Sequence, residues 1–264
     1  MKTAVNPVST IVSRDEWLHA RQELLTQEKA LTRQYDVVAA ARRTLPWVQI
    51  EKEYEFDTPD GKRTLSQIFD GRSQLIVRHF MLGLDWKEGC VGCAFASDHV
   101  GGALIHLQNH DVTYVAVSRA PLHQIELLRK RMGWVFPWFS SFASDFNFDF
   151  YVSFTKEEMA KGEVFYNYRM TRASIEDLSG LSVFYKDSDG RIFHTYSTYA
   201  RGDEGGLTTY FYLDLTPKGR NETGRGNLGD WVRHHDRYDA GGYVDPEGRY
   251  HDDREEDEPS PAQS

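Results

Sequence analysis

The amino-acid sequence predicts an α/β fold built around a parallel sheet. Residues 73–82 (SQLIVRHFML) and 111–118 (DVTYVAVS) are near-continuous apolar runs of strand length, as expected for strands that are buried on both faces. Each run is followed by a helical pattern, over residues 90–108 and 120–133. This order of strand, helix, strand and helix is typical of a βαβ unit with parallel strands.

A long amphipathic helix is predicted before this unit, over residues 13–45. Ser13 and Glu16 have the spacing of a capping box, and Pro46 stops the helix. Apolar residues recur at every seventh position: Trp17, Leu24, Leu31, Val38 and Leu45. The stripe can dock on the chain's own domain or on a second copy. Docking on its own domain is preferred, because the nearby charges show no clear pairing pattern; a homodimer is the alternative.

Turn chemistry predicts further elements on both sides of the unit. Residues 53–69 are predicted to form a β-hairpin around Pro-Asp-Gly, followed by a short helical turn. Residues 181–197 have the strongest hairpin pattern, with two aromatic-rich runs around Asp-Ser-Asp-Gly. Two more strands and two aromatic segments complete the folded part, which ends near residue 240: strands at 148–154 and 163–170, and segments 208–215 and 231–238.

Composition and charge divide the chain into a helical arm (1–50), an α/β domain (51–240) and an acidic tail (241–264). The formal net charge is −9, and residues 245–264 hold eight acids against two arginines. A segment so charged, without large aliphatic residues, is expected to be disordered. No basic cluster predicts a nucleic-acid partner. No segment reaches the ~18 apolar residues that a membrane span needs, so we expect a cytoplasmic protein without membrane contacts.

The two cysteines, Cys90 and Cys93, lie between the first buried strand and the next helix. A close pair in a cytoplasmic protein indicates redox chemistry or metal binding. Cys90 falls at the start of the helix, where free N–H groups and the helix dipole favour a thiolate, and Cys93 follows one turn later. We predict that Cys90, facing solvent, attacks a disulfide of a protein or small thiol compound. Cys93, shielded by the turn, then resolves the mixed disulfide.

Two other interpretations of the pair stay open: half of a zinc site, or two thiols that only pack as small hydrophobes. No second Cys-x-x-Cys or suitable histidine pair completes a zinc site, so neither a metal nor another cofactor is predicted. His234 and His235 are adjacent and would diverge on a helix, so we expect them at a solvated helix end. His79, on a buried strand, is expected to be a core histidine.

Many segments resemble DUF899, a mostly bacterial family described as thioredoxin-like. The resemblance covers about residues 8–240 and includes IVSRDEWL, FDGRSQLIVRHFMLGLDWKEGCVGC, YVAVSRAPL, GWVFPWFSSFASDFNFDF and LSVFYKDSDGRIFHTYSTYARG. The same stretches are similar to the peroxiredoxin branch of the thioredoxin superfamily. The resemblance implies an α/β thioredoxin-like fold with a peroxiredoxin-style N-terminal β-hairpin, a long N-terminal helix and a helical C-terminal extension.

The sequence departs from both relatives at the site. Peroxiredoxins place a hydroxyl three residues before the reactive sulfur, where this chain has Lys87, which argues against an efficient peroxidase. Thioredoxins place a cis-proline opposite the cysteines, before a late strand. Leu181 or Ser182 is expected there instead.

Three further residues are predicted to support the reactive cysteine. Trp86 either shields the sulfur and forms a substrate platform, or closes the edge of the core. Lys87 would lower the pKa of the thiol, whereas Asp85 or Glu88 would raise it. Arg119 follows the second buried strand at its C-terminal end, where sites form in open parallel sheets. It is a candidate to stabilise the thiolate or an anion, with a surface salt bridge as the alternative.

The leading functional hypothesis is therefore a thiol–disulfide oxidoreductase that acts through Cys90 and Cys93. A binding or scaffold protein of the same fold, in which the cysteines have no catalytic role, is the first alternative. A weak thiol peroxidase is the second.

Overall fold

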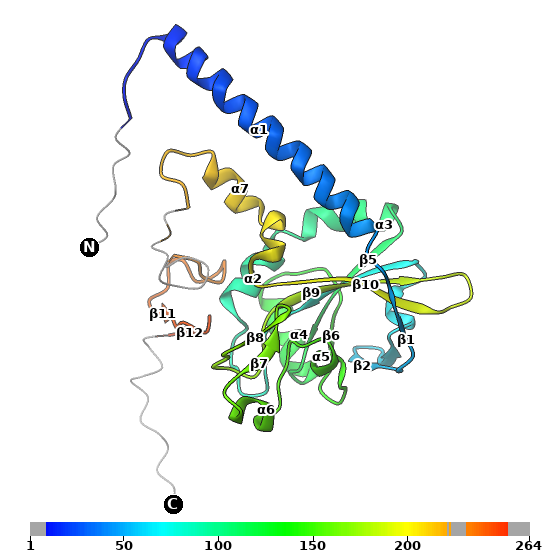
Figure 1. Cartoon of the computed structure of the whole chain (residues 1–264). Helices are drawn as coiled ribbons and strands as arrows, with labels where there is room; N and C mark the ends of the chain where they lie inside the picture. Colours follow the sequence, from blue (N-terminus) through cyan, green and yellow to red (C-terminus); the bar gives the residue numbers. More distant parts are fainter. Residues whose placement is uncertain (1–8, 221, 223–230, 253–264) are drawn as a thin grey trace, which may run out of the picture.

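An eight-stranded mixed sheet forms the centre of the computed structural model, which describes residues 9–220, 222 and 231–252 (Figure 1). Its strands are β1 (Val48–Ile50), β2 (Glu55–Thr58), β3 (Gly61–Thr64), β4 (Gln74–His79), β5 (Val112–Ser118), β6 (Trp138–Ser140), β9 (Gly180–Lys186) and β10 (Ile192–Tyr199). In space they follow the order β1-β10-β9-β4-β5-β6-β2-β3. The neighbours β4, β5 and β6 run parallel, and the hairpin of β9 and β10 lies antiparallel beside β4.

The predicted βαβ unit is present. α2 (Val91–Asp98) follows β4, and α4 (Leu122–Arg131) follows β5. The predicted helix over residues 90–108 is broken, because α2 ends before a 3₁₀ turn, η2 (Gly101–Ala103), and α3 (Leu104–Asn109) begins after it. The break falls at two consecutive glycines, which are poor helix formers.

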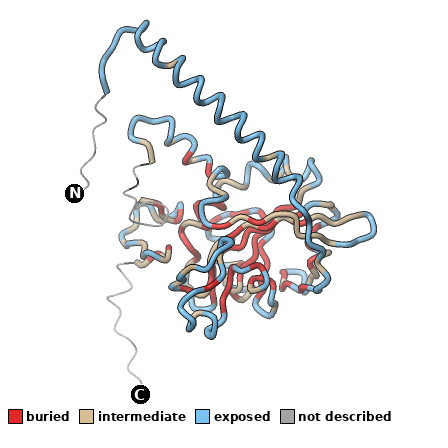
Figure 2. The backbone as a smooth tube through the Cα atoms, in the orientation of Figure 1, coloured by how far each residue is buried: buried red, intermediate tan, exposed pale blue. Residues whose placement is uncertain are grey.

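The buried residues, red in Figure 2, run along the central strands, and large apolar side chains cover both faces of the sheet. On one face the sheet packs against α2, α3 and α4 in a cluster that includes Phe80, Ile125 and Trp138. The other face holds an aromatic cluster around Phe146 and Phe184. Burial on both sides explains why β4 and β5 appear in the sequence as continuous apolar runs.

Both predicted hairpins of the sheet are confirmed. β2 pairs with β3 and is followed by the turn η1 (Gln67–Phe69), and β9 pairs with β10. The strand predicted at 148–154 is wrong, since α5 (Phe146–Asp149) and a turn occupy this stretch. α6 (Lys156–Ala160) follows. The strand predicted at 163–170 is a separate small hairpin, β7 (Val164–Tyr166) and β8 (Arg169–Thr171), with left-handed turn residues between its strands.

The N-terminal helix is α1 (Arg14–Arg43), and its predicted capping box between Ser13 and Glu16 is confirmed. It extends away from the body of the molecule (Figure 1), and none of its residues is buried. Leu31 in its apolar stripe is 71% exposed. The prediction that this stripe docks on the chain's own domain is therefore wrong. The boundary of the arm at residue 50 is also shifted, because β1 joins the sheet beside β10.

The C-terminal part begins with the 3₁₀ helix η3 (Ala200–Gly206) and α7 (Thr208–Asp214). The described start of the predicted disordered tail, residues 241–252, is folded instead. It forms a hairpin of β11 (Tyr243–Val244) and β12 (Tyr250–His251), and Tyr250 packs in a third apolar cluster against α2 and α7. Residues 253–264 of the predicted tail lie outside the described residues. Within the described part of the chain, no helix combines the length and apolar character that crossing a membrane requires.

Candidate active site

The cysteine loop connects β4 to α2 and places Cys90 at the N-cap of α2, as predicted. The N–H of Cys90 donates to the carbonyl of Met81 (3.0 Å), which closes the loop. The preceding residue, Gly89, packs so closely against Phe80 that a β-carbon at this position would come within 2.4 Å of the ring. A residue with a side chain would therefore displace the loop that presents Cys90.

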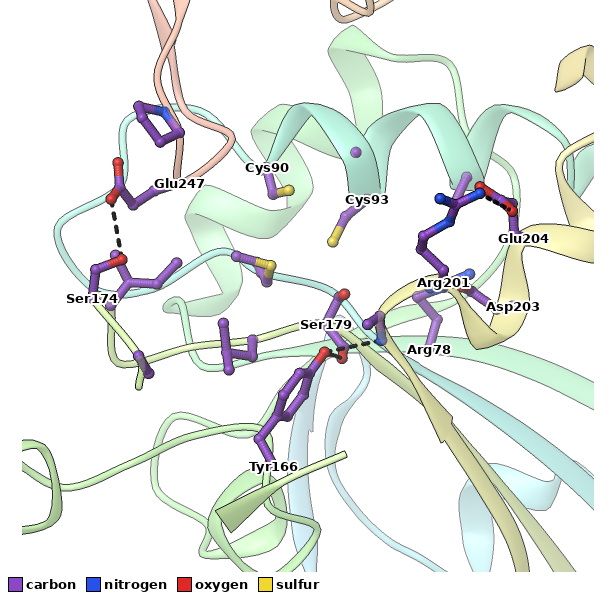
Figure 3. Close-up of a pocket in the computed structure, with 18 of the residues that line it drawn as sticks. Arg78, Cys90, Cys93, Tyr166, Ser174, Ser179, Arg201, Asp203, Glu204 and Glu247 are labelled. Carbon is purple, nitrogen blue, oxygen red and sulfur yellow. Dashed lines mark hydrogen bonds and ion pairs between the residues drawn. The ribbon is translucent and has the colours of Figure 1, made fainter. Parts of the chain in front are cut away.

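The two cysteines line one cavity of about 280 Å³, and Figure 3 shows their side chains directed into it. Both are free thiols, 2% and 3% exposed. The prediction that Cys90 faces solvent is wrong, because loops from the C-terminal half of the chain cover it. Cys93 is shielded, as expected, but no more than Cys90. The cavity is therefore the route by which another molecule reaches either sulfur.

The interaction between the two neighbouring cysteines gives them different acidities. The Cys93 thiol donates to Cys90 and lowers the pKa of Cys90, although burial acts in the opposite direction. The backbone N–H groups of Cys93 and Gly92 also lower the pKa. The same bond, together with burial and the negative charge on Cys90, raises the pKa of Cys93 well above its ordinary value. Cys90 is thus the more acidic of the two thiols and Cys93 the less acidic.

Arg78 of β4 is a further cavity residue that the sequence analysis missed. Its side chain is only 7% exposed and forms an ion pair with Asp203 of η3. Its positive charge lowers the pKa of Cys90 and opposes the rise at Cys93. A charged residue inside the apolar run of β4 was the available signal, because such a residue is rarely buried without a partner.

The wall opposite the cysteines is formed by the chain just before β9. Leu178 and Ser179 line the cavity there, and the carbonyl of Ser179 accepts a hydrogen bond from Tyr166 (2.8 Å). The prediction that Ser182 faces the cysteines is wrong, since its hydroxyl bonds to His79 on the other face of the sheet (2.9 Å). Leu181 pairs with Arg78 in the register of β9 and β4 but is not among the cavity residues.

A loop of the C-terminal hairpin covers the cavity above Cys90. The carbonyl of Gly248 accepts the N–H of Val91, the first residue of α2 (2.8 Å). A β-carbon on Gly248 would lie 3.1 Å from the Cys90 sulfur, and this glycine has a φ of +87°. Glu247 reaches across to the opposite wall and accepts a hydrogen bond from Ser174 (3.1 Å; Figure 3). We refer to residues 245–249 as the cover loop.

Residues 234–237 contact the cysteine loop through hydrogen bonds to Gly89 and Glu88. His234 is fully buried and lies 2.9 Å from the carbonyl of Gly89 through Nε2, so its predicted place at a solvated helix end is wrong. Glu88 bonds to Arg131 (2.8 Å) and Arg237 (2.7 Å). Burial opposes the charge of Glu88, but these guanidinium groups lower its pKa. The loop is thereby fixed by contacts that are distant in sequence.

Trp86 and Lys87 line a different cavity, of about 380 Å³, on the outer side of the cysteine loop. Trp86 packs against the edge of the core, and the guanidinium of Arg249 lies 4.8 Å from its ring centre. Trp86 is therefore a core-edge residue and not a wall of the cysteine cavity. Lys87 is exposed, and neither residue lies among the groups that set the pKa of Cys90.

Arg119 does not stabilise the thiolate as predicted. Its guanidinium is engaged by Asp177 (2.7 and 3.1 Å) and Glu176 (3.1 Å), and it does not line the cysteine cavity. Asp177 is buried and also accepts a hydrogen bond from Ser153 (2.6 Å). Arg119 thus joins the end of β5 to the segment before β9 in a largely buried ion pair. Arg119 therefore forms a salt bridge, as the alternative interpretation proposed, but the salt bridge is largely buried and not on the surface.

Among the described residues, no three histidine, cysteine or carboxylate side chains gather closely enough to hold a metal ion. His235 is directed away from His234 and lies 2.8 Å from Asp98. The histidine pair and the cysteine pair therefore form no common ligand set there. The chemistry available at the site is that of the two sulfurs.

Strand order and site together define a thioredoxin-like protein. The strands β10-β9-β4-β5 contain a parallel pair flanked by an antiparallel hairpin, and the Cys-x-x-Cys motif begins the helix after β4. The chain belongs to the DUF899 family, described as a bacterial protein of unknown function, whose model matches residues 7–238. The predicted family is therefore confirmed. No curated protein matches the chain.

Several solved structures are similar to this chain at low identity. Peroxidoxin BcpB from Mycobacterium tuberculosis is 12% identical, with 62% of this chain and 95% of that chain covered and a TM-score of 0.42. A mutant of peroxiredoxin Q from Xanthomonas campestris is 12% identical over 60% and 90% of the two chains, with a TM-score of 0.40. A reduced 2-Cys peroxiredoxin from Plasmodium vivax is 12% identical over 65% and 94%, with a TM-score of 0.38. The strand order of the sheet itself defines the fold.

Proposed function

We propose that the protein is a thiol–disulfide oxidoreductase in which Cys90 is the nucleophile and Cys93 the resolving thiol. The observation that carries this proposal is that both cysteine side chains, at the start of α2, are directed into one cavity that the buried Arg78 also lines. A structural pair of thiols would need neither a buried positive charge nor an empty volume beside it. A reducing, cytoplasmic setting would supply the dithiol form that begins the cycle.

The first step forms one disulfide and breaks another. The Cys90 thiolate attacks one sulfur of a substrate R–S–S–R′, so that a Cys90–S–S–R bond forms and R′S⁻ leaves. The leaving thiolate takes up a proton from the surrounding solvent or from the Cys93 thiol. The lowered pKa of Cys90 supports this step, because only the thiolate attacks a disulfide.

The second step depends on Cys93. Once Cys90 is part of the mixed disulfide, it no longer carries the negative charge that raises the pKa of Cys93. The positive charge of Arg78 then favours the Cys93 thiolate, which attacks the Cys90 sulfur and releases RS⁻. In total the substrate disulfide gains two electrons and becomes two thiols, while the cysteine pair becomes a disulfide. A thiol reductant returns the pair to its starting form.

The enclosure of the site favours small substrates. A cavity of about 280 Å³ lies just below the ~300–1,000 Å³ of pockets for drug-sized ligands. A disulfide on the surface of a folded protein cannot approach Cys90 while the cover loop lies above it. We therefore assign a small disulfide as the substrate, in preference to a protein.

The direct test is disulfide reduction coupled to dithiothreitol, with a small disulfide and with insulin as alternative substrates. The wild type should accelerate reduction of the small compound, and the Cys90→Ser variant should not. Cys93→Ser should accumulate a mixed disulfide with one half of the substrate, detectable by mass spectrometry. The pH profile of Cys90 alkylation should shift upward in Cys93→Ala, because the donor to the thiolate is gone.

Equal rates for the wild type and Cys90→Ser would refute the proposal and favour the scaffold hypothesis. Peroxide-dependent thiol consumption far above that of free cysteine would favour the peroxidase hypothesis instead. Insulin reduction as fast as reduction of the small disulfide would contradict the assigned substrate size, but not the chemistry.

A further inference from the structure

Six charged side chains line the cysteine cavity, and their pairing indicates the charge of the substrate. The three arginines and three carboxylates are Arg78, Arg172, Arg201, Asp203, Glu204 and Glu247. Arg78 pairs with Asp203, and Arg201 pairs with Glu204 (2.9 Å). Within the described part of the chain, Arg172 and Glu247 form no ion pair, with each other or with any other group. One positive and one negative charge of the cavity therefore stay uncompensated.

Both residues line the cavity, and the chain brings them near each other. Glu247 is bonded to Ser174, two residues from Arg172, and Figure 3 shows Glu247 and Ser174 on the Cys90 side. The compensated pair of Arg78 and Asp203 lies at the other end, beyond Cys93 (Figure 3). A molecule that reaches Cys90 through this cavity thus passes walls that carry one unpaired cation and one unpaired anion among the described residues. Among the described residues, the Glu247 carboxylate is bonded to a neutral hydroxyl and to no cation, so its charge is available to a ligand.

We infer that the substrate is a small zwitterionic disulfide, with an ammonium and a carboxylate group near the sulfur, as in an α-amino acid disulfide. Arg172 would bind the carboxylate, and Glu247 would bind the ammonium group. Opposite charges on the two partners complement each other in this arrangement, whereas a substrate of one sign would leave one protein charge facing a like charge. This inference rests on the proposed function and specifies its substrate class.

The test compares three small disulfides that differ in charge: cystine (zwitterionic), cystamine (dicationic) and 3,3′-dithiodipropionate (dianionic). Each rate is divided by the rate with dithiothreitol alone, which removes the intrinsic reactivity of the compound. The wild type should act fastest on cystine. Because both charges lie at an accessible rim, we expect each one to contribute up to about fivefold in kcat/KM.

Two variants test whether Arg172 and Glu247 cause the preference for cystine. Arg172→Gln should slow cystine and dithiodipropionate by up to about fivefold but should not slow cystamine, because it removes a like charge that faces this dication. Glu247→Gln should slow cystine and cystamine but should not slow dithiodipropionate, while its amide oxygen can still accept the hydrogen bond of Ser174. Arg169→Gln is the matched control, because Arg169 is exposed on β8 and does not line the cavity.

Equal normalised rates for the three compounds, or variants that keep the wild-type pattern, would overturn the zwitterionic assignment and leave the redox chemistry standing. Absence of any Cys90-dependent turnover with all three compounds would remove the proposed function, and this inference with it. The two failures are therefore distinguishable.

Discussion

Two neighbouring residues of β4, one charged and one neutral, lie on opposite faces of the sheet. Arg78 brings a permanent charge to the cysteine cavity. His79 points to the other face, where it stacks on Phe146 (5.5 Å) and bonds to Ser182. Burial, with a smaller effect from the charge of Arg78, lowers the pKa of His79 to about 3. The core therefore requires this imidazole to be neutral.

This requirement predicts a pH dependence of stability. In the unfolded chain the pKa of this histidine is about 6.5. Between about pH 6.5 and pH 3 the unfolded state therefore binds a proton at His79 that the folded state does not bind. The free energy of unfolding should fall as the pH drops through this window, by up to ~1.4 kcal/mol per pH unit from this group. Denaturant titrations of the wild type and His79→Gln at several pH values should show a shallower slope in the variant.

The matched control is His106→Gln, which removes an exposed histidine and should keep the wild-type slope. The slope is the informative quantity, because any packing cost of the core substitution affects stability at every pH. Identical slopes for the wild type and His79→Gln would show that His79 accepts a proton in the folded state.

The reactive pair was predictable from the sequence, whereas its surroundings were not. Cys-x-x-Cys after a buried strand is a local pattern, and local geometry alone places Cys90 at the helix start. Arg78 was visible as a charged residue in an apolar run, but its partner Asp203 is distant in the sequence and was not predictable. Arg119 was assigned to the site from its place at a strand end, but Asp177, 58 positions away in the chain, holds it elsewhere. Sequence spacing does not encode such long-range pairing.

At the level of elements, access to the cysteines depends on the cover loop. It is held at one side by the bond from Val91 to Gly248 and at the other by the bond from Ser174 to Glu247. Tyr250 anchors the following strand in the cluster with α2 and α7. Opening one bond of the loop while Tyr250 stays packed would expose Cys90 without unfolding the domain.

Ser174→Ala should therefore increase the rate at which a thiol reagent labels Cys90. A typical hydrogen bond contributes about 1 kcal/mol, so the open form should gain up to about fivefold in population. Ser179→Ala removes a hydroxyl from the same cavity without breaking this bond and serves as the matched control. Stopped-flow labelling with a small aromatic disulfide would measure the effect, and equal rates in both variants would contradict a gating role of the loop.

The regular elements were predicted well where the pattern was local. Alternating strands and helices, the capping box of α1 and the turn of the β9–β10 hairpin all depend on residues close in sequence. The aromatic run at 148–154 was read as a strand because aromatic residues favour strands, but the core packs it as a helical turn. The charge of the C-terminal stretch suggested disorder. The structure instead packs Tyr250 of this stretch in the apolar cluster with α2 and α7.

At the scale of the whole molecule, α1 stands out because the rest of the described chain buries none of its residues. A helix of 30 residues with no buried side chain gains little from its own bonds, since most helix stability in proteins comes from packing. It is about 45 Å long. Its first half, residues 14–28, holds four carboxylates and two arginines, and its second half, residues 29–43, four basic residues and one carboxylate.

This gradient predicts a homodimer in which two α1 helices pair antiparallel through the apolar stripe, because only this orientation sets each acidic half against a basic half. Leu31→Glu should convert the dimer to a monomer without loss of helix content, since Leu31 is 71% exposed in the single chain. Ala40→Glu, on the opposite side of the helix, should remain dimeric. Light scattering after gel filtration measures both, and a monomeric wild type at tens of micromolar would contradict the prediction.

The stretch shared with the family ends at residue 238, whereas the cover loop and its two short strands follow at residues 243–251. The residues that affect the pKa of the two cysteines therefore lie in one part of the chain, and the residues that control access to the cysteines lie in another. Nine residues near the C-terminus could be exchanged to admit larger disulfides while the nucleophile, its resolving partner and Arg78 stay as they are. A peptide disulfide would then become a test substrate for a chain whose chemistry is unaltered.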